Sequence, residues 1–230
     1  MARKPETDIE SAVIQSAMTL FAERGYRAVR LADIALHAGC DLGDLRRRFD
    51  DKSAILGRFL IGIDAAVLGD DPDFGEEESV RDRLFDLLMR RFDALQPHRD
   101  ALASVRRDLR GDLPAMLCLA PQGLRALGWY LEAAGESADG LAGAIRIKGL
   151  AAVWLNCLNV WFKDDSEDLS KTMAELDKSL ARAERAANWF AGLPGPRRPS
   201  GSAPEDAAAA GDADSPAGGG ENGSENGARA

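Results

Sequence analysis

The sequence predicts an all-α protein in which a small three-helix head is joined to a larger helical bundle. Apolar residues recur at steps of three and four through most of the chain, the spacing of a helix that buries one face. Glycine, proline and acidic residues divide these series, and no segment shows the alternating pattern of a half-buried strand. With 230 residues, 45% of them hydrophobic and 29% charged, the chain can bury one substantial core and a smaller second one.

The first predicted helix of the head lies just before Gly25. Apolar residues from Ile9 to Phe21 recur at helical spacing and give this segment one buried face. Thr7 and Glu10 stand three residues apart at its start, the spacing of a capping box. Gly25 is then the residue expected to end the helix.

Two shorter helices and a longer one complete this part of the chain. Apolar residues predict short helices at Leu31–His37 and Leu42–Phe49, and Gly39 makes the tight turn between them. A longer apolar series over 51–68 predicts a fourth helix that leads out of the head. We therefore assign residues 1–56 to the head and treat 51–68 as its connection to the body.

The stretch Gly69–Glu78 is rich in Asp, Gly, Pro and Glu and indicates a loop, so the body is assigned to residues 76–192. Ser79 and Asp82 have the spacing of a second capping box. From Pro194 onward the chain contains no large apolar side chain, and residues 193–230 are predicted to form a disordered acidic tail rich in Gly, Ala and Pro. Body helices are predicted from Ser79 to the residue before Pro97, then at His98–Arg110, Pro121–Ala134, Ala138–Phe162 and Ser166–Phe190, with a break near Asp112–Pro114.

The net charge of −9 argues against a general polyanion binder, because affinity for nucleic acid depends on lysine and arginine neutralising phosphates. Acidity alone does not exclude DNA binding, since a local basic face on one module can be sufficient. The head, residues 1–56, is neutral, with nine basic and nine acidic residues.

The cysteines and the apolar segments argue against metal, disulfide and membrane chemistry. Cys40, Cys118 and Cys157 are widely separated and lack the paired spacing of zinc or redox motifs, so we expect apolar fillers, no metal and no cofactor. The longest apolar stretch, Gly149–Phe162, is too short to span a bilayer, and the N-terminal residues are polar. We therefore expect a cytoplasmic protein with no integral membrane association.

Several short motifs in the head occur in one characteristic order. Residues 20–26 read Leu-Phe-Ala-Glu-Arg-Gly-Tyr, residues 33–35 read Asp-Ile-Ala, and Ala38-Gly39, Leu45, Phe49 and Lys52 follow. Over residues 8–56 this order resembles the TetR family of transcriptional regulators. The resemblance implies a helix-turn-helix head that binds DNA and a helical body that binds a ligand and a second subunit.

In a helix-turn-helix, the second short helix enters the major groove. Leu45 and Phe49, four residues apart, would pin this recognition helix to the first helix, and the basic run Arg46–Arg48 is then the DNA-facing group. Arg30 stands where the family commonly has a serine or threonine cap, and Asp44 stands where it favours small polar residues. The residues expected to contact DNA are Arg30, Asp41, Leu42, Asp44, Arg46, Arg47, Arg48 and Lys52.

The body is expected to hold a small apolar ligand, as TetR-like bodies do. Aromatic and methionine side chains suit such a pocket because they are large and adaptable, although each of them also suits an ordinary core. The residues expected to line it are Phe85, Met89, Phe92, Met116, Trp129, Tyr130, Trp154 and Leu158.

The resemblance also implies a homodimer in which the last two long helices of each subunit form a four-helix bundle. Two-fold pairing would place two recognition helices about one DNA turn apart on a palindromic operator. The protein would then be a repressor that its ligand releases from DNA. The residues expected at the dimer interface are Trp161, Leu169, Met173, Leu176, Leu180 and Ala187.

A second resemblance supports a different hypothesis. The segment Ser79–Leu102, together with Trp161, Asp164–Ser166 and Thr172–Asp177, is similar to a ubiquinone-biosynthesis accessory family with a TetR-like fold. That family implies binding of an isoprenoid lipid without DNA binding, which a neutral head would suit.

An enzyme is the third class of function, and the sequence offers little for it. His37 and His98 are the only histidines, and neither stands near a nucleophile in the sequence. No phosphate-binding glycine loop or metal-ligand cluster appears in the sequence. We therefore assign no catalytic residue.

Overall fold

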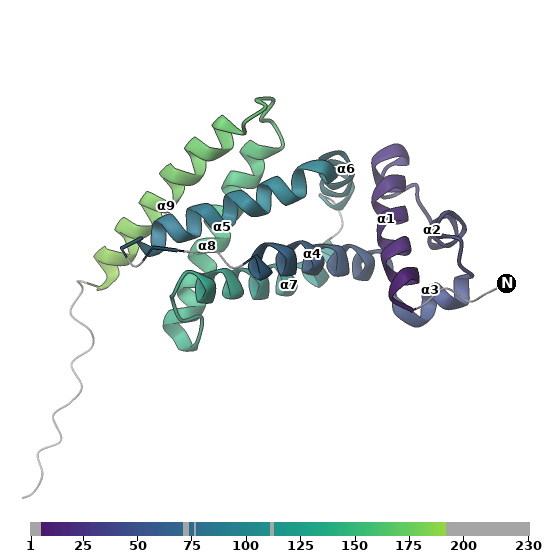
Figure 1. Ribbon diagram of the computed structural model, residues 1–230, viewed down its shortest axis with the longest axis horizontal. Helices are drawn as coiled ribbons and strands as arrows, with labels where there is room; N and C mark the ends of the chain where they lie inside the picture. The colour runs from purple at the N-terminus through teal and green to yellow at the C-terminus, as the bar shows by residue number, and fades with distance from the viewer. Residues whose placement is uncertain (1–5, 71–73, 76, 111–112, 192–230) are drawn as a thin grey trace, which may run out of the picture. The chain divides into compact units, whose positions relative to one another are not determined.

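A computed structural model describes residues 6–70, 74–75, 77–110 and 113–191 of the chain (Figure 1). All regular structure within these ranges is helical, which confirms the predicted all-α class. The predicted tail, 193–230, lies outside the described residues. The elements are α1 Glu6–Arg24, α2 Leu31–Ala38, α3 Leu42–Arg48, α4 Lys52–Gly69, α5 Val80–Leu95, the 3-10 turn η1 Gln96–His98, α6 Arg99–Leu109, α7 Leu113–Ala133, α8 Gly140–Trp161 and α9 Ser170–Ala191.

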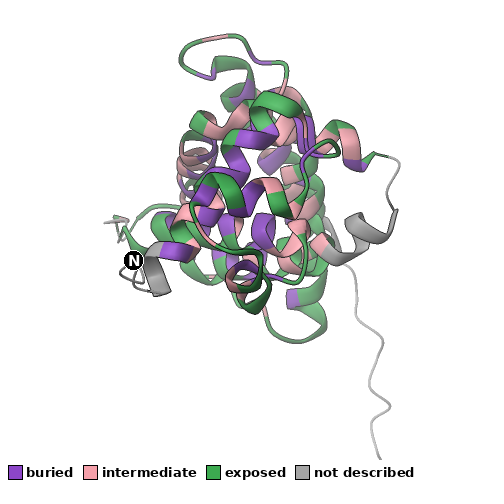
Figure 2. Ribbon diagram, turned by 90° about the vertical axis from the view of Figure 1, so that its right-hand side faces the viewer, coloured by how far each residue is buried: buried purple, intermediate pink, exposed green. Residues whose placement is uncertain are grey.

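Helices α1, α2 and α3 form the predicted head. Gly25 and Gly39 have φ angles of 86° and 69°, a left-handed conformation that glycine adopts at little cost, and they end α1 and α2 as predicted. Val13, Ile34 and Leu45 are fully buried, one from each of the three helices. Buried residues lie along the inward-facing sides of the helices and exposed residues along the outward-facing sides (Figure 2).

Head and body belong to one compact unit because α1 packs against α6 as well as against α2 and α4. The Ser104 hydroxyl of α6 donates to the Phe21 carbonyl of α1 at 2.7 Å. The backbone N–H of Arg27, just after α1, donates to the Asp108 carboxylate of α6 at 2.7 Å. The first helix of the head is therefore fixed to the body through hydrogen bonds as well as apolar packing.

Three predicted helix starts are wrong. Helix α1 begins at Glu6, so Thr7 lies inside it and not at its cap. Helix α7 begins at Leu113 and contains Pro121, which was predicted to start it. Packing of α7 against α4 and α8 outweighs the helical hydrogen bond that a proline cannot donate. Ser79 is confirmed as the N-cap of α5, since its hydroxyl accepts the N–H of Asp82 at 3.2 Å.

The third wrong start is that of α9, which begins at Ser170 and not at Ser166. Asp164, fully buried in the preceding turn, accepts both the N–H and the hydroxyl of Thr172 at 2.7 Å and the N–H of Ser166 at 3.2 Å. Burial disfavours the charge, but the hydrogen bonds from Ser166 and Thr172 outweigh it and hold the pKa of Asp164 well below its usual 3.8. Leu169 then has a φ of 54°, so the chain turns once more before the helix starts.

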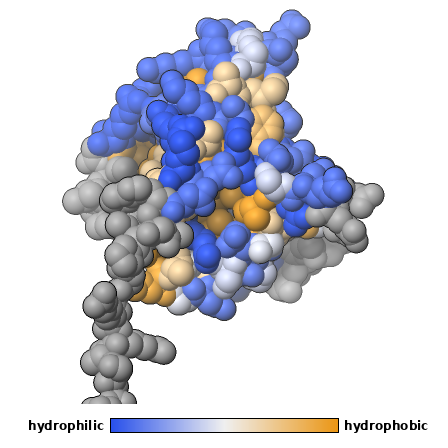
Figure 3. Space-filling view, turned by 90° about the vertical axis from the view of Figure 1, so that its left-hand side faces the viewer, coloured by the Kyte–Doolittle hydropathy of each residue, from blue (hydrophilic) through white to orange (hydrophobic). Residues whose placement is uncertain are grey.

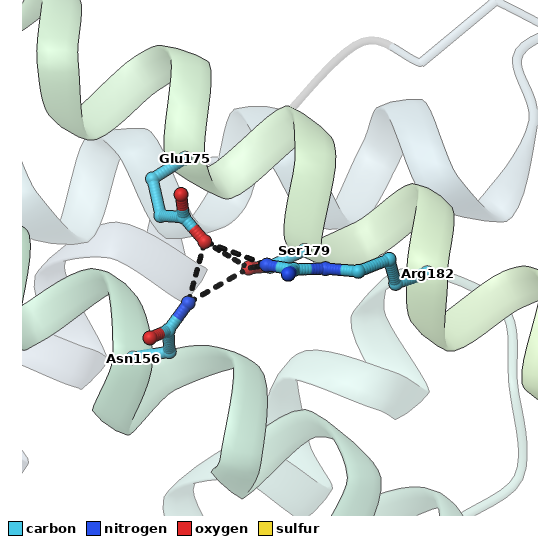
Figure 4. Close-up of polar contacts among 4 residues, drawn as sticks. All are labelled: Asn156, Glu175, Ser179 and Arg182. Carbon is cyan, nitrogen blue, oxygen red and sulfur yellow. Dashed lines mark hydrogen bonds and ion pairs between the residues drawn. The ribbon is translucent and has the colours of Figure 1, made fainter.

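Helices α8 and α9 form an antiparallel pair joined by a polar cluster as well as by apolar packing (Figure 4). The Asn156 amide of α8 donates to the Glu175 carboxylate at 2.5 Å and to the Ser179 hydroxyl at 3.1 Å. Arg182 donates to the same Glu175 oxygen at 2.6 Å. This cluster fixes the register of the two helices.

Candidate nucleic-acid interface and ligand cavity

Helix α3 is anchored as the sequence predicts. Leu45 and Phe49 are 0% and 3% exposed and hold the helix against the rest of the head. Leu42 is 51% exposed, and the side chains of Arg46 and Arg47 are 68% and 58% exposed. Anchoring one face of α3 therefore leaves Leu42, Arg46 and Arg47 on the solvent side.

The three arginines at the end of α3 are all paired with aspartates. Arg46 donates to the Asp50 carboxylate at 2.5 Å, and Arg47 donates to that of Asp44. Arg48 differs because its side chain is only 12% exposed, and it donates to the Asp44 backbone carbonyl at 2.8 Å. Two of the three predicted DNA-facing arginines are thus accessible, and both have an acidic partner within the head.

Arg30 and Asp41 lie at the N-terminal ends of α2 and α3. The backbone N–H of Arg30 donates to Asp33 at 2.9 Å, while the Arg30 guanidinium is 81% exposed. Asp41 caps α3 by accepting the N–H of Asp44 at 2.6 Å, and this hydrogen bond lowers the pKa of Asp41. Asp41 and Asp44 therefore both have identified roles within α3 itself, as a cap and as the partner of Arg47.

Lys52 has a structural position that sequence analysis missed. Its ammonium, at the start of α4, donates to the carbonyls of Tyr26 and Val29 at 2.6 Å and 2.8 Å and lies 4.4 Å from the Tyr26 ring centroid. Burial lowers the pKa of Lys52. These contacts fasten the first turn of α4 to the loop after α1.

A cavity of about 420 Å³ lies between α4, α5 and α7. Figure 1 shows α4 running alongside α7, and the Gln122 amide of α7 lies against Gly57 of α4, since a Cβ there would be 2.2 Å from the amide oxygen. The lining residues are Gly57, Leu60, Ile61, Asp64, Ala65 and Leu68 of α4, Arg91 of α5, and Gln122, Gly123, Arg125, Ala126 and Trp129 of α7.

The predicted pocket residues lie elsewhere, with one exception. Trp129 lines the cavity and is 67% exposed, whereas Phe92 and Tyr130 are fully buried in the core. Phe92 stacks on Trp154 with a 4.5 Å centroid separation. Phe85, Met89 and Leu158 also pack against that core, and the Met116 side chain lies outside the described residues. Large aromatic side chains thus fill the centre of the body, and the cavity forms beside α4.

A buried ion pair forms part of the cavity wall. The Asp64 carboxylate of α4 lies 2.9 Å from Arg91 Nε and accepts from Arg91 Nη2 at 3.2 Å. The Tyr130 hydroxyl of α7 donates to Asp64 at 3.1 Å. Three helices therefore meet at one carboxylate. A single aspartate within the apolar run of α4 was the sequence signal that could have located this site.

For four of the predicted dimer residues, burial within one subunit contradicts the predicted place at the interface. Trp161, Leu169, Leu176 and Leu180 are 0–4% exposed within a single subunit, so a partner subunit cannot contact them as the structure stands. Met173 is 37% exposed and Ala187 is exposed. The exposed large apolar side chains of α8 are Leu141, Ile145 and Leu155, at 80%, 60% and 59%. The face viewed in Figure 3 shows hydrophobic patches among hydrophilic side chains.

Helix α8 is the one helix of the described part of the chain that could cross a membrane by length and composition alone. Mostly buried core helices pass the same test, but only 22% of the apolar window of α8 is buried, although α8 packs against α7 and α9. No group of three or more His, Cys, Asp and Glu side chains that could hold a metal ion occurs within the described ranges.

Comparison with known proteins assigns the head and the fold. Residues 13–59 match the family described as bacterial regulatory proteins, tetR family. No curated protein matches the sequence.

Solved structures resemble the chain over most of its length. A TetR transcriptional regulator from Nitrosomonas europaea is 22% identical, with 76% of this chain and 98% of that one covered and a TM-score of 0.63. A TetR regulator from Rhodococcus sp. RHA1 is 17% identical, with 77% and 96% covered and a TM-score of 0.61. The transcriptional regulator FadR from Bacillus subtilis, in complex with stearoyl-CoA, is 18% identical, with 74% and 97% covered and a TM-score of 0.53. Residues 13–59 of the head therefore match the tetR family of bacterial regulatory proteins, and the chain as a whole has the fold of solved TetR-type regulators.

Proposed function

We propose that the protein is a cytoplasmic, homodimeric transcriptional repressor that binds a palindromic operator and leaves it when a small, largely apolar ligand enters the body. The observation that carries the proposal is the anchored α3 of a TetR-type head, with Arg46 and Arg47 exposed on its free face. That placement is what major-groove and phosphate contact by a recognition helix requires.

The aspartate partners of these arginines weaken DNA binding without preventing it. Exposed ion pairs contribute only about 0.2–1 kcal/mol, so a DNA phosphate can replace Asp50 at Arg46 at small cost, and replacing Asp44, which is 14% exposed, at Arg47 costs more. The displaced carboxylates remain beside the phosphates and repel them. We therefore expect binding that depends strongly on salt and is tight only where both heads of the dimer engage.

The ligand would act through α4. This helix contributes half of the cavity lining, and its first turn is fastened to the head by Lys52. A ligand that changes the packing of α4 against α7 would therefore move the heads, and it can shift DNA affinity only by its difference in affinity for the two arrangements. The stearoyl-CoA complex of FadR supports a ligand with an apolar part.

Dimerisation is proposed through α8 and α9. Leu141, Ile145 and Leu155 fall within about 80° of one another around α8, at 100° per residue, and so form one exposed apolar face. Met173 of α9 is a further exposed apolar side chain. Burying this face against a second copy removes from water the largest exposed aliphatic side chains of the helix.

Selection of bound duplexes from a random DNA pool tests the proposal, followed by gel shift of the selected duplex. We expect a palindromic sequence, weaker binding by Arg47→Ala, and unchanged binding by Arg185→Ala, an exposed arginine of α9. The ubiquinone-accessory hypothesis is not favoured, since the head matches the regulator family. It would be revived if no duplex were selected and a quinone-like lipid stayed bound through purification.

A further inference from the structure

The cavity wall carries an excess of positive charge. Its charged members are Asp64, Arg91 and Arg125, and two arginines against one aspartate give +1 in a chain whose net charge is −9. Asp64 neutralises Arg91 through the buried ion pair. Among the described residues, no carboxylate pairs with Arg125.

We propose that the ligand is an anionic amphiphile, with a compact apolar body and one carboxylate that the Arg125 guanidinium receives. This rests on the proposed function, since it names the ligand class of the same cavity. At roughly 30 Å³ per water-sized group, about 420 Å³ accommodates roughly a dozen non-hydrogen atoms. Among the uncharged lining residues, Leu60, Ile61, Ala65, Leu68 and Ala126 are apolar and suit the body of such a molecule, and Gln122 is polar.

Arg125 is placed to receive the charged end. It stands four residues before Trp129, so the two side chains are neighbours on one face of α7, and both are exposed while lining the cavity. Trp129 and Ile61 also line this region and are 67% and 52% exposed, so apolar surface is accessible there beside the arginine. A carboxylate there stays partly hydrated and can take two guanidinium N–H groups, while its apolar tail covers Trp129 and Ile61.

Arg91 does not compete for this role. Its Nε and Nη2 face the two oxygens of Asp64, and its guanidinium lies 4.4 Å from the Trp154 ring centroid. If Arg91 turned away to bind a ligand, the buried Asp64 carboxylate would keep only the Tyr130 hydroxyl as a partner. Arg91 is thus committed to the fold, and Arg125 is the arginine left for a ligand.

A second hollow offers a contrast. It lies between the end of α1 and α6 and contains Glu23, Arg24, Asp100 and Arg107, so its charges balance. No excess of either sign exists there for a charged ligand, whereas the cavity beside α4 is apolar and carries one surplus cation.

Calorimetric titration of the full chain with three ten-carbon probes tests the proposal: decanoate, decan-1-ol and decylammonium. We expect decanoate to bind about fivefold more tightly than decan-1-ol, the upper factor for an exposed ion pair, and decylammonium to bind most weakly. Arg125→Gln should bring decanoate and decan-1-ol to equal affinity, and Arg125→Lys should restore part of the preference. Arg185→Gln, a change outside the cavity lining, should change nothing.

Equal binding of decanoate and decan-1-ol by the unaltered chain would overturn the anionic ligand class, and so would a preference that survives Arg125→Gln. Absence of binding by all three probes would overturn it as well. None of these titrations contains DNA, so they are independent of the operator experiment. If DNA binds but decanoate is not preferred, the regulator proposal stands and only the ligand class fails.

Discussion

Helix α3 and the cavity wall both pair arginine with aspartate, yet the two pairs differ in their exposure to water. On α3 the Arg46–Asp50 pair is 68% and 85% exposed, whereas the Arg91–Asp64 pair in the body is 5% and 12% exposed. Water screens the first pair, so its partners can be exchanged; burial makes the second costly to break. Exposure, and not the identity of the residues, decides which pair is available for binding and which is part of the fold.

The largest effect is expected from breaking the buried pair. Arg91→Ala leaves Asp64 buried with one hydrogen-bond donor, and should lower the free energy of unfolding by about 3–5 kcal/mol. Arg90→Ala breaks a pair with Asp86 at 2.8 Å whose side chains are 37% and 45% exposed, and should cost less, about 1 kcal/mol. Urea unfolding at one fixed protein concentration measures both. Equal losses would show that burial does not separate the two kinds of pair.

Asp164 is a second buried carboxylate, and its effect on stability should depend on pH. Asp164→Ala removes the acceptor for Thr172 and Ser166 and should cost about 2–3 kcal/mol at neutral pH, while exposed Asp165→Ala should cost little. Because the hydrogen bonds depress the pKa of Asp164, its contribution is complete above the usual 3.8 and is lost as pH falls below it. The difference in the free energy of unfolding between wild type and Asp164→Ala should therefore be smaller at pH 3 than at pH 7. A constant difference would contradict the depressed pKa.

Burial also decides the effect of adding one methyl group to α8. A Cβ on Gly143 would lie 2.1 Å from the backbone of Ala138, so Gly143→Ala should destabilise the fold by about 1–3 kcal/mol. Gly149, on the same helix, has nothing within 4 Å, and Gly149→Ala should gain about 0.5–1 kcal/mol from helix propensity. Thermal unfolding of the two variants in parallel should give shifts of opposite sign. A loss in both would mean that the face carrying Gly149 is also covered, as a dimer interface would cover it.

Local structure was predicted well from the sequence because it depends on residues that are close together in the chain. Gly25, Gly39 and Ser79 act through their own backbone conformation or through a residue three positions away, and each was placed correctly. Helix α7 was misplaced at Pro121 because its stability comes from packing against α4 and α8, which a sequence pattern does not contain.

The candidate site was harder to predict because its parts come from distant segments. Phe92 and Trp154 were assigned to a pocket on their chemistry, but they stack on each other and fill the core. Asp64, Arg91 and Arg125 were missed, since only the packing of α4, α5 and α7 brings them to one cavity. Lys52 was predicted to contact DNA, although its ammonium donates hydrogen bonds to two backbone carbonyls of the head.

A smaller effect on stability is expected on α3, where substitutions should change DNA affinity without changing the fold. Arg46→Ala and Arg47→Ala should each leave the free energy of unfolding within about 0.5 kcal/mol of wild type, because both side chains are exposed. Urea unfolding checks this. A large loss of stability would show that these arginines, like Arg91, stabilise the fold.

The most direct measurement is the affinity of a selected duplex as a function of salt for wild type, Arg46→Ala and Asp50→Asn. If the exposed arginines exchange aspartate for phosphate, Arg46→Ala should weaken binding and reduce the salt slope by about 1, and Asp50→Asn should tighten binding because Arg46 loses its competitor. Unchanged affinity and slope in both variants would contradict the claim that α3 contacts DNA through its exposed, exchangeable arginines.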